Sequence, residues 1–180
     1  MDPEKIDKVK LVAAVLYQNR EDLKEAFALL ESTFSPIDHV GDFFPFELTD
    51  YYEPEMGAEL QRGIISFSEL VHPGFLAESK KITKGLEQKL SVNQKRKINI
   101  DIGYLDLFKV VLASYKERSN KIYLSDGIWA DMILYFDSGD YKTFSWGFPD
   151  FKTGIYNPAF GEIRNAYKLQ LRKENKALSQ

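Results

Sequence analysis

The 180-residue sequence contains no cysteine and only two histidines, His39 and His72. The absence of cysteine excludes disulfide bonds, thiolate nucleophiles and cysteine-based zinc or iron–sulfur sites. The two histidines are far apart in the sequence and share no ligand spacing, which argues against a joint metal or catalytic role. A phosphate-binding glycine loop, a dinucleotide-binding motif and a nucleophile elbow are also missing. The sequence therefore lacks the signatures of several large enzyme classes.

An excess of one charge and a long apolar run are absent as well. The formal net charge is −3, and lysine and arginine are spread along the chain. This balance argues against nucleic acid and against an anionic membrane as partners. No apolar stretch approaches the length of a membrane-spanning helix, and the charged N-terminus has no apolar signal-peptide core. We therefore expect a cytoplasmic protein with no membrane partner.

Hydrophobic residues are abundant, at 44% of the chain, and aromatic residues make up 14%. This composition suits one folded domain over residues 1–180. The 13 phenylalanines and 10 tyrosines exceed what one small core would bury. Because aromatic side chains concentrate at interfaces, some are expected to line a cleft or the contact of a homo-oligomer.

Strand and helix patterns alternate in the first half of the chain. Apolar runs predict buried strands, and apolar residues at helical spacing predict amphipathic helices, the first capped by Asn19. Pro45 restricts its extended segment to a sheet edge or a loop. We predict strands at 9–16, 39–48, 61–67 and 98–104, and helices from just after Asn19 to Phe34 and at 75–90. This order is the βαββαβ pattern of ferredoxin-like sheets.

Antiparallel hairpins and a closing helix are expected in the second half. Asp126-Gly127 and Ser138-Gly139 are hairpin-turn pairs. Residues 105–116 fit a helix or a strand, and we favour a strand for their second half. Alternation after the first turn predicts one apolar face, made of Ile128, Ala130, Met132, Leu134 and Phe136. The fold class is therefore a single α+β domain with a predominantly antiparallel sheet, added hairpins and a C-terminal helix.

Six segments resemble, in the same order, the signature of the uncharacterised prokaryotic family called domain of unknown function 4416. They are Phe44-Pro45-Phe46, 49–53 with 55–57, 99–101 with 103–105, 111–114 with Lys116, 122–124 with 126–128, and Phe148-Pro149-Asp150-Phe151. The resemblance spans most of the chain and implies a small cytoplasmic protein without an assigned activity. Two positions depart from the family pattern: Ile102 replaces a usual proline, and Asp131 replaces a usual glutamate. The shorter acid shifts its carboxylate by about one methylene, which weakens a strict metal-ligand role there.

Carboxylates form the first group of candidate site residues. Asp50 and Glu55 lie in a loop, Asp101 on a strand and Asp131 on a hairpin. Carboxylates on neighbouring strands can converge on a divalent cation such as Mg²⁺, and Asp50, Glu55 and Asp101 would be its ligands. The alternative is a structural ion-pair network in which Asp101 or Asp131 binds one of three basic residues, Arg62, Lys109 or Lys116.

Tyrosines and basic residues form the second group. Tyr51, Tyr52, Tyr104 and Tyr123 could stack on a base or sugar, while a nearby cation neutralises a phosphate. Packing in the core or at an interface would explain the same rings without a ligand. The combined ligand-binding prediction is Asp50, Tyr51, Tyr52, Glu55, Arg62, Asn99, Asp101, Lys109, Lys116 and Asp131.

Three functions are compatible with these residues. The first is binding of a small polar or nucleotide-like ligand in a cleft between the 50–57 loop and the strands bearing Asp101, Lys109 and Lys116. The second is a divalent-metal-dependent hydrolase or phosphotransferase that uses the same carboxylates. The third is a non-enzymatic scaffold or oligomeric subunit, in which the polar residues only hold the sheet together.

Overall fold

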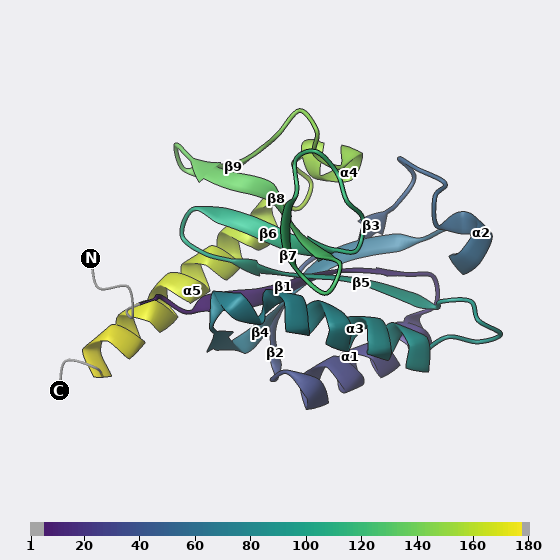
Figure 1. Ribbon diagram of the computed structural model, residues 1–180, viewed down its shortest axis with the longest axis horizontal. Coiled ribbons are helices and arrows are strands. Elements are labelled where there is room, and N and C mark those ends of the chain that lie inside the picture. The colour runs from purple at the N-terminus through teal and green to yellow at the C-terminus, as the bar shows by residue number, and fades with distance from the viewer. Residues whose placement is uncertain (1–5, 178–180) are drawn as a thin grey trace.

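A nine-stranded antiparallel sheet runs through the whole molecule, with helices on both of its faces (Figure 1). The computed structural model describes residues 6–177. Its helices are α1 (Arg20–Thr33), α2 (Glu53–Met56), α3 (Leu76–Lys89), α4 (Pro149–Lys152) and α5 (Asn157–Ala177), with a 3₁₀ turn at Pro73–Phe75. Its strands are β1 (Val9–Tyr17), β2 (Ile37–Val40), β3 (Phe44–Pro45), β4 (Gln61–Val71), β5 (Ile98–Leu105), β6 (Lys109–Ser114), β7 (Ile122–Ser125), β8 (Ile128–Asp137) and β9 (Asp140–Thr143).

The strand order is β2-β4-β1-β5-β6-β8-β7, with β3 paired to β4 and β9 paired to β8. Within β2-β4-β1-β5, α1 and α3 are the two helical connections, which is the βαββαβ arrangement that the sequence predicted. The short β3 and α2 are inserted between β2 and β4. The remaining strands extend the sheet beyond β5 as antiparallel hairpins. The predicted α+β class and antiparallel sheet are therefore confirmed.

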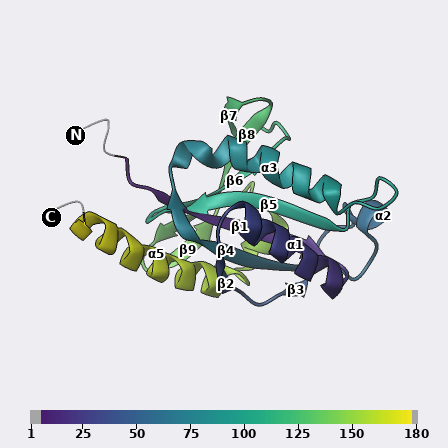
Figure 2. The ribbon, with the colours of Figure 1, turned by 90° about the horizontal axis from the view of Figure 1, so that it is seen from below.

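Each face of the sheet buries its own apolar cluster. Helices α1 and α3 lie side by side on one face (Figure 2), where they cover Ile98, Ile100 and Ile102 of β5. Helix α5 covers the other face with Phe160 and Ile163. Because side chains alternate along a strand, the residues between the β5 isoleucines point to the α5 face. Asn99 and Asp101 are thereby placed on that second face.

Three local predictions are confirmed by the structure. Asn19 caps α1, since its side chain accepts a hydrogen bond from the backbone N–H of Glu21. Residues Lys109–Ser114 form a strand rather than a helix. Both predicted hairpin turns have left-handed backbone conformations, with φ of 52° and 72° at Asp126-Gly127. This pair of positive φ values is the conformation that a two-residue hairpin connection requires.

The single apolar face predicted for β8 is wrong. The partners of Val110 and Val111 in β6 are Leu134 and Met132, so Ile133 is an extra residue in a β-bulge. A bulge of one residue reverses the facing of every side chain that follows it. Ala130 therefore packs on the α3 side, whereas Leu134 packs on the α5 side. Met132, which alternation placed in the core, is exposed.

A buried lysine fastens α5 to the first strands. Lys10 of β1 is fully buried and donates hydrogen bonds to Asp38, to the carbonyl of Phe67 and to Gln170 of α5. All three donors of its ammonium group are thus satisfied, as burial of a charge requires. Asp38 also accepts a hydrogen bond from Ser66 of β4. Asp38 of β2 neutralises the charge of Lys10, and the hydrogen bond from Lys10 to Gln170 fixes the position of α5 across the sheet.

Candidate functional site

The polar centre of the molecule is Arg62 of β4, whose side chain is only 4% exposed. Its Nη1 lies 2.9 Å from Oδ2 of Asp150 in α4, and its Nη2 lies 3.0 Å from Oδ2 of Asp101 in β5. The guanidinium carbon also lies within 5.4 Å of the ring centres of Phe46 and Phe151. A buried guanidinium between two carboxylates is neutralised on both sides, and its planar fork suits that role.

Strand β1 separates β4 from β5, and its residue opposite Asp101 is Ala14. The small alanine side chain leaves room on the α5 face for the arginine to reach across. Asp150 comes from α4, directly after Pro149 at the start of that helix. Tyr156 completes the group by donating a hydrogen bond of 3.2 Å to Asp150 Oδ2. Side chains from β4, from β5 and from the segment around α4 therefore meet at the Arg62 guanidinium.

Asp101 differs from Asp150 because its carboxylate is partly open to solvent, with 24% of the side chain exposed. Its Oδ2 accepts hydrogen bonds from Arg62 and Asn99, whereas its Oδ1 has a longer contact of 3.6 Å with Nζ of Lys80. Burial alone would raise the pKa of Asp101, but Lys80, Arg62 and the amide of Asn99 outweigh it and lower the pKa below its ordinary value. The group is therefore a carboxylate at neutral pH.

Lysine and glutamate side chains from α3 complete the open edge of β5. Strand β6 pairs with β5 only from Gly103 onward, so the backbone of Ile100 has no strand partner on that side. Its N–H donates to Oε1 of Glu87 at 2.5 Å, and its carbonyl accepts from Nζ of Lys80 at 3.1 Å. Burial raises the pKa of Glu87 despite the opposing charge of Lys80. Helix α3 thus substitutes for a neighbouring strand beside Asp101.

A second arginine extends the network towards α2. Arg96 binds both carboxylate oxygens of Glu55, with distances of 2.8 Å from Nε to Oε1 and 2.6 Å from Nη2 to Oε2. Its Nη1 donates to Oδ1 of Asn99 at 2.8 Å, and Asn99 in turn donates to Asp101. The hydrogen bonds from Arg96 lower the pKa of Glu55. The bidentate pair therefore connects α2 to the start of β5.

Tyrosines and a lysine form the outer rim of this network. The ring of Tyr52 packs edge-on against Phe46 and Tyr51, and burial together with the charge of Asp101 raises the pKa of its hydroxyl. Tyr51 is exposed, and Nζ of Lys116 lies 3.7 Å from its ring centre. A cation over an aromatic face is a favourable contact. The rim therefore presents an aromatic ring and a positive charge to solvent.

A separate ion pair lies on the neighbouring hairpin. Asp131 of β8 is buried, with Oδ2 at 3.2 Å from Nζ of Lys121 and Oδ1 accepting from Asn120. Lys121 also donates to Ser114 of β6. The partners of Asp131 therefore come from the loop before β7, not from the three basic residues expected.

Most of the ligand-binding residues predicted from the sequence meet in this region, and three do not. Glu55, Arg62, Asn99 and Asp101 share one hydrogen-bonded network, and Tyr51, Tyr52 and Lys116 border it. Lys109 instead pairs with Asp106 beside the β5–β6 turn. Asp50 is exposed, and Asp131 belongs to its own ion pair.

The predicted metal ligands Asp50, Glu55 and Asp101 do not form a metal cluster. Glu55 is held by Arg96 and Asp101 by Arg62, so arginines occupy the positions that a cation would need. Across residues 6–177, no three histidine, aspartate or glutamate side chains converge as a metal site requires. The geometry is that of the alternative, an ion-pair network, and the predicted pairing of Asp101 with Arg62 is present.

Sequence patterns missed several members of the network. Four residues that make ion pairs in the network were not candidates: Asp150, Arg96, Glu87 and Lys80. Asp150 lies in the Phe148–Phe151 segment that carried the family resemblance, and its acid between aromatic residues was a usable signal. Glu87 and Lys80 are seven residues apart on α3 and so share one face, which is consistent with a buried polar pair.

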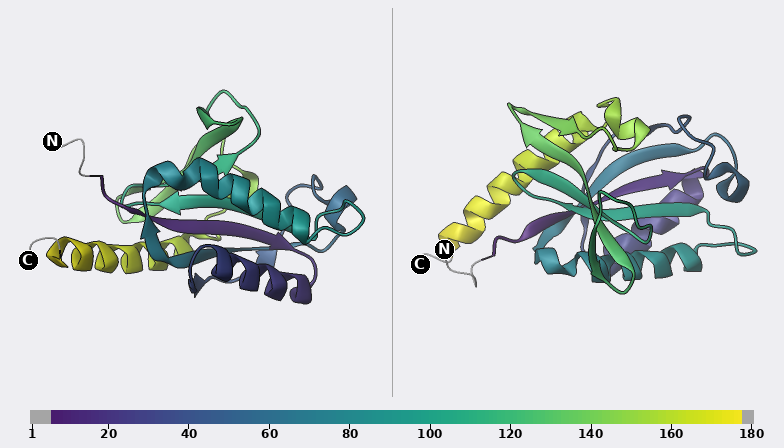
Figure 3. Two further views of the ribbon diagram at one scale, coloured as in Figure 1. Left: turned by 60° about the horizontal axis from the view of Figure 1, so that its bottom comes forward. Right: turned by 45° about the horizontal axis from the view of Figure 1, so that its top comes forward.

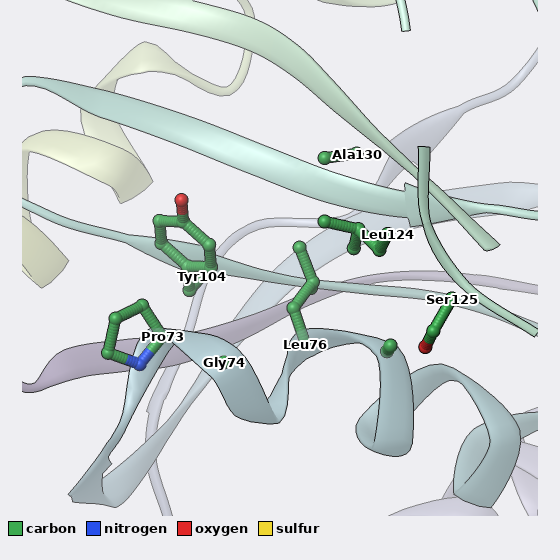
Figure 4. A pocket seen from close by; sticks show the side chains of 8 residues that line it. Pro73, Gly74, Leu76, Tyr104, Leu124, Ser125 and Ala130 are labelled. Atoms are coloured by element: carbon green, nitrogen blue, oxygen red, sulfur yellow. The ribbon is translucent and has the colours of Figure 1, made fainter. Parts of the chain in front are cut away.

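Surface hollows lie elsewhere on the described part of the chain. One of about 270 Å³ is bounded by the start of α3 and by β7, with Leu76, Tyr104 and Leu124 in its wall (Figure 4). Another of about 290 Å³ adjoins the β5–β6 turn and includes Tyr104 and Lys109. Neither of these two hollows is lined by Asp101 or by a residue of the 50–57 loop.

Comparison with protein families gives one match. The family described as Domain of unknown function (DUF4416) matches residues 7–167. The chain belongs to this family. The match covers every element from β1 to the middle of α5, so the polar network lies entirely within the DUF4416 region. Comparisons with curated proteins and with solved structures found no match. Within residues 6–177, no helix is both long enough and apolar enough to cross a membrane.

Proposed function

We propose that this protein binds a small polar ligand over the Asp101 carboxylate. One observation supports this proposal above the others. Both oxygens of Glu55 accept charge-assisted hydrogen bonds, and Asp150 is buried, whereas Asp101 keeps Oδ1 with only a 3.6 Å contact to Lys80 while the side chain stays 24% exposed. A carboxylate oxygen held in place by its neighbours and reachable from solvent is a suitable acceptor for hydroxyl or amino groups.

The surroundings of Asp101 indicate the chemistry of the ligand. Tyr51 offers an exposed ring, and Lys116 places a positive charge 3.7 Å from the centre of that ring. A ring for stacking, a cation for an anionic group and a carboxylate for hydroxyls suit a nucleotide-like molecule. The ion pairs of Arg62 and Arg96 keep the acceptor rigid, which lowers the entropic cost of binding.

A thermal-shift screen of the purified protein with nucleoside mono- and diphosphates tests this proposal. A probe at 100 times its Kd stabilises the folded state by about 2.7 kcal/mol, which is roughly 5–10 °C in melting temperature for a chain of this size. The variant Asp101→Asn is expected to fold and to lose the shift. Asp106→Asn, which alters an acid paired with Lys109 elsewhere, is the matched control and should keep it.

Two outcomes would overturn the proposal. The first is the absence of a shift with every nucleotide in the wild-type protein. The second is an equal shift in wild type and Asp101→Asn, because the ligand would then bind without the carboxylate.

A further inference from the structure

The open oxygen of Asp101 lies beside a lysine that can still donate a hydrogen bond. Oδ2 of Asp101 accepts from Arg62 and from Asn99, whereas Oδ1 accepts no hydrogen bond from residues 6–177. Three polar side-chain atoms in this part of the chain are buried without a partner, and none of them belongs to Asp101. Oδ1 is therefore accessible from solvent.

The lysine is Lys80, which reaches Asp101 over the edge of β5. Helix α3 lies along β5 on the face opposite α5 (Figure 3), and β6 pairs with β5 only from Gly103 onward. Nζ of Lys80 donates to the carbonyl of Ile100 at 3.1 Å, and it lies 3.6 Å from Oδ1 of Asp101. An ammonium group has three donors, and the carbonyl uses one of them.

Other acids do not take the remaining donors of Lys80. Glu87 accepts from the backbone N–H of Ile100 at 2.5 Å, and its second oxygen lies 3.8 Å from Nη1 of Arg96. In the described part of the chain, Asp101 is the one carboxylate that forms an ion pair with Lys80. Asp101 is ionised, because its neighbours lower its pKa, so its oxygens can only accept hydrogen bonds.

The spacing of Lys80 and Asp101 selects the kind of group that can bind between them. A distance of 3.6 Å is too long for a direct hydrogen bond, yet one oxygen atom can bond to both, since such bonds measure about 2.7–2.9 Å. That atom has to accept from Nζ and donate to Oδ1. A hydroxyl group does both, whereas a protonated amine only donates and a phosphate oxygen only accepts. The pair therefore favours a hydroxyl group.

We infer that Asp101 and Lys80 together hold a ribose hydroxyl of a nucleotide, so that Lys80 determines specificity for the sugar. This inference rests on the proposed function, in which the ring of Tyr51 stacks on the base and the charge of Lys116 faces the phosphate. The sugar is then the part of the ligand that remains for the carboxylate. Of the groups on a ribose, the 2′ and 3′ hydroxyls both donate and accept.

Calorimetric titration of the full-length protein with the four ribonucleoside 5′-monophosphates, and with their 2′-deoxy and 3′-deoxy analogues, tests this inference. At least one ribonucleotide is expected to bind. Its analogue without the bridging hydroxyl should bind roughly 10- to 100-fold more weakly, the loss typical of a hydrogen bond to a charged group. Comparison of the two analogues identifies which hydroxyl is bound.

The variant Lys80→Met removes the donor but keeps an unbranched side chain of similar length. The preference for the ribonucleotide over the weaker analogue should fall by about tenfold, because the hydroxyl loses the bond from Lys80. Lys84→Met is the matched control, since Lys84 lies one turn further along α3 and its Nζ contacts the ring of Tyr115. It should keep the full preference. Circular dichroism melts show whether each variant is folded, and the wild-type comparison decides alone if Lys80→Met is not.

The possible failures separate this inference from the proposed function. Equal affinities of the wild type for the ribonucleotides and both kinds of analogue would overturn the inference and leave the ligand site in place. A preference that is unchanged in a folded Lys80→Met would also overturn it, because the hydroxyl would then bind without the lysine. If no nucleotide binds, the proposed function is wrong and the inference falls with it.

Discussion

Replacing Arg62 with methionine is expected to destabilise the protein by about 4 kcal/mol, the cost of leaving a buried charge without its partner. Methionine fills much of the space of the arginine side chain, so the loss is mainly electrostatic. Asp150 would keep only the hydroxyl of Tyr156, and Asp101 would keep Asn99 and the more distant Lys80. Chemical denaturation at neutral pH, followed by circular dichroism, measures the effect.

A second substitution distinguishes a stranded charge from a packing defect. If the unpaired carboxylate causes the loss, then Arg62→Met combined with Asp150→Asn should be more stable than Arg62→Met alone. Arg118→Met, at an exposed position, is the matched control and should change stability by no more than about 0.5 kcal/mol. An equal loss in the single and double variants would show that Asp150 does not depend on Arg62.

Substitution of Gly103 by alanine is expected to cost roughly 3 kcal/mol through overpacking. A Cβ at this position would lie 2.2 Å from the backbone oxygen of Val111 and 2.6 Å from Cδ2 of Leu112. The leucine side chain can move, but the carbonyl of β6 cannot, because β6 is paired on both sides by β5 and β8. The strands must separate where β6 joins the sheet.

The control for Gly103→Ala is the same substitution at Gly85 in α3. A Cβ at Gly85 meets nothing within 4 Å, so alanine should stabilise the helix by about 0.5–1 kcal/mol. Unfolding free energies of the two variants should therefore change in opposite directions. Equal stabilities would show that β5 and β6 are not as close as the structure has them.

Local patterns predicted the long helices and most strands of this fold, but they missed the short helices α2 and α4, and the segment predicted at 39–48 is two short strands, β2 and β3. Residues close together in the sequence are enough to indicate helices α1 and α3 and the turn at Asp126-Gly127. These predictions are confirmed. The bulge at Ile133 depends on how β8 fits β6, so alternation along β8 alone led to the wrong face for Met132.

The candidate site was predicted only in part, because some of its contacts also depend on how distant parts of the chain pack together. Asn99 and Asp101 alternate with buried isoleucines, which placed them together on one face. The contact between Arg62 and Asp150 joins residues 88 positions apart and arises only when α4 packs over β4. The position of Lys109 was misjudged because β6 starts beside the far end of β5 and runs back towards the network, so its first residue, Lys109, lies at the end remote from Asp101.

The most direct test of the Asp101 site is an NMR titration of its side-chain carboxyl carbon. The charges of Lys80 and Arg62 outweigh burial and lower its pKa, so the midpoint should lie below the ordinary aspartate value of about 3.9. A lowered pKa contributes stability that is present above this ordinary value and is lost as the pH falls through the folded-state pKa. The stability difference between wild type and Asp101→Asn should therefore disappear over the same pH range. A midpoint at or above the ordinary value would contradict the Arg62–Asp101 pair on which the proposed ligand site depends.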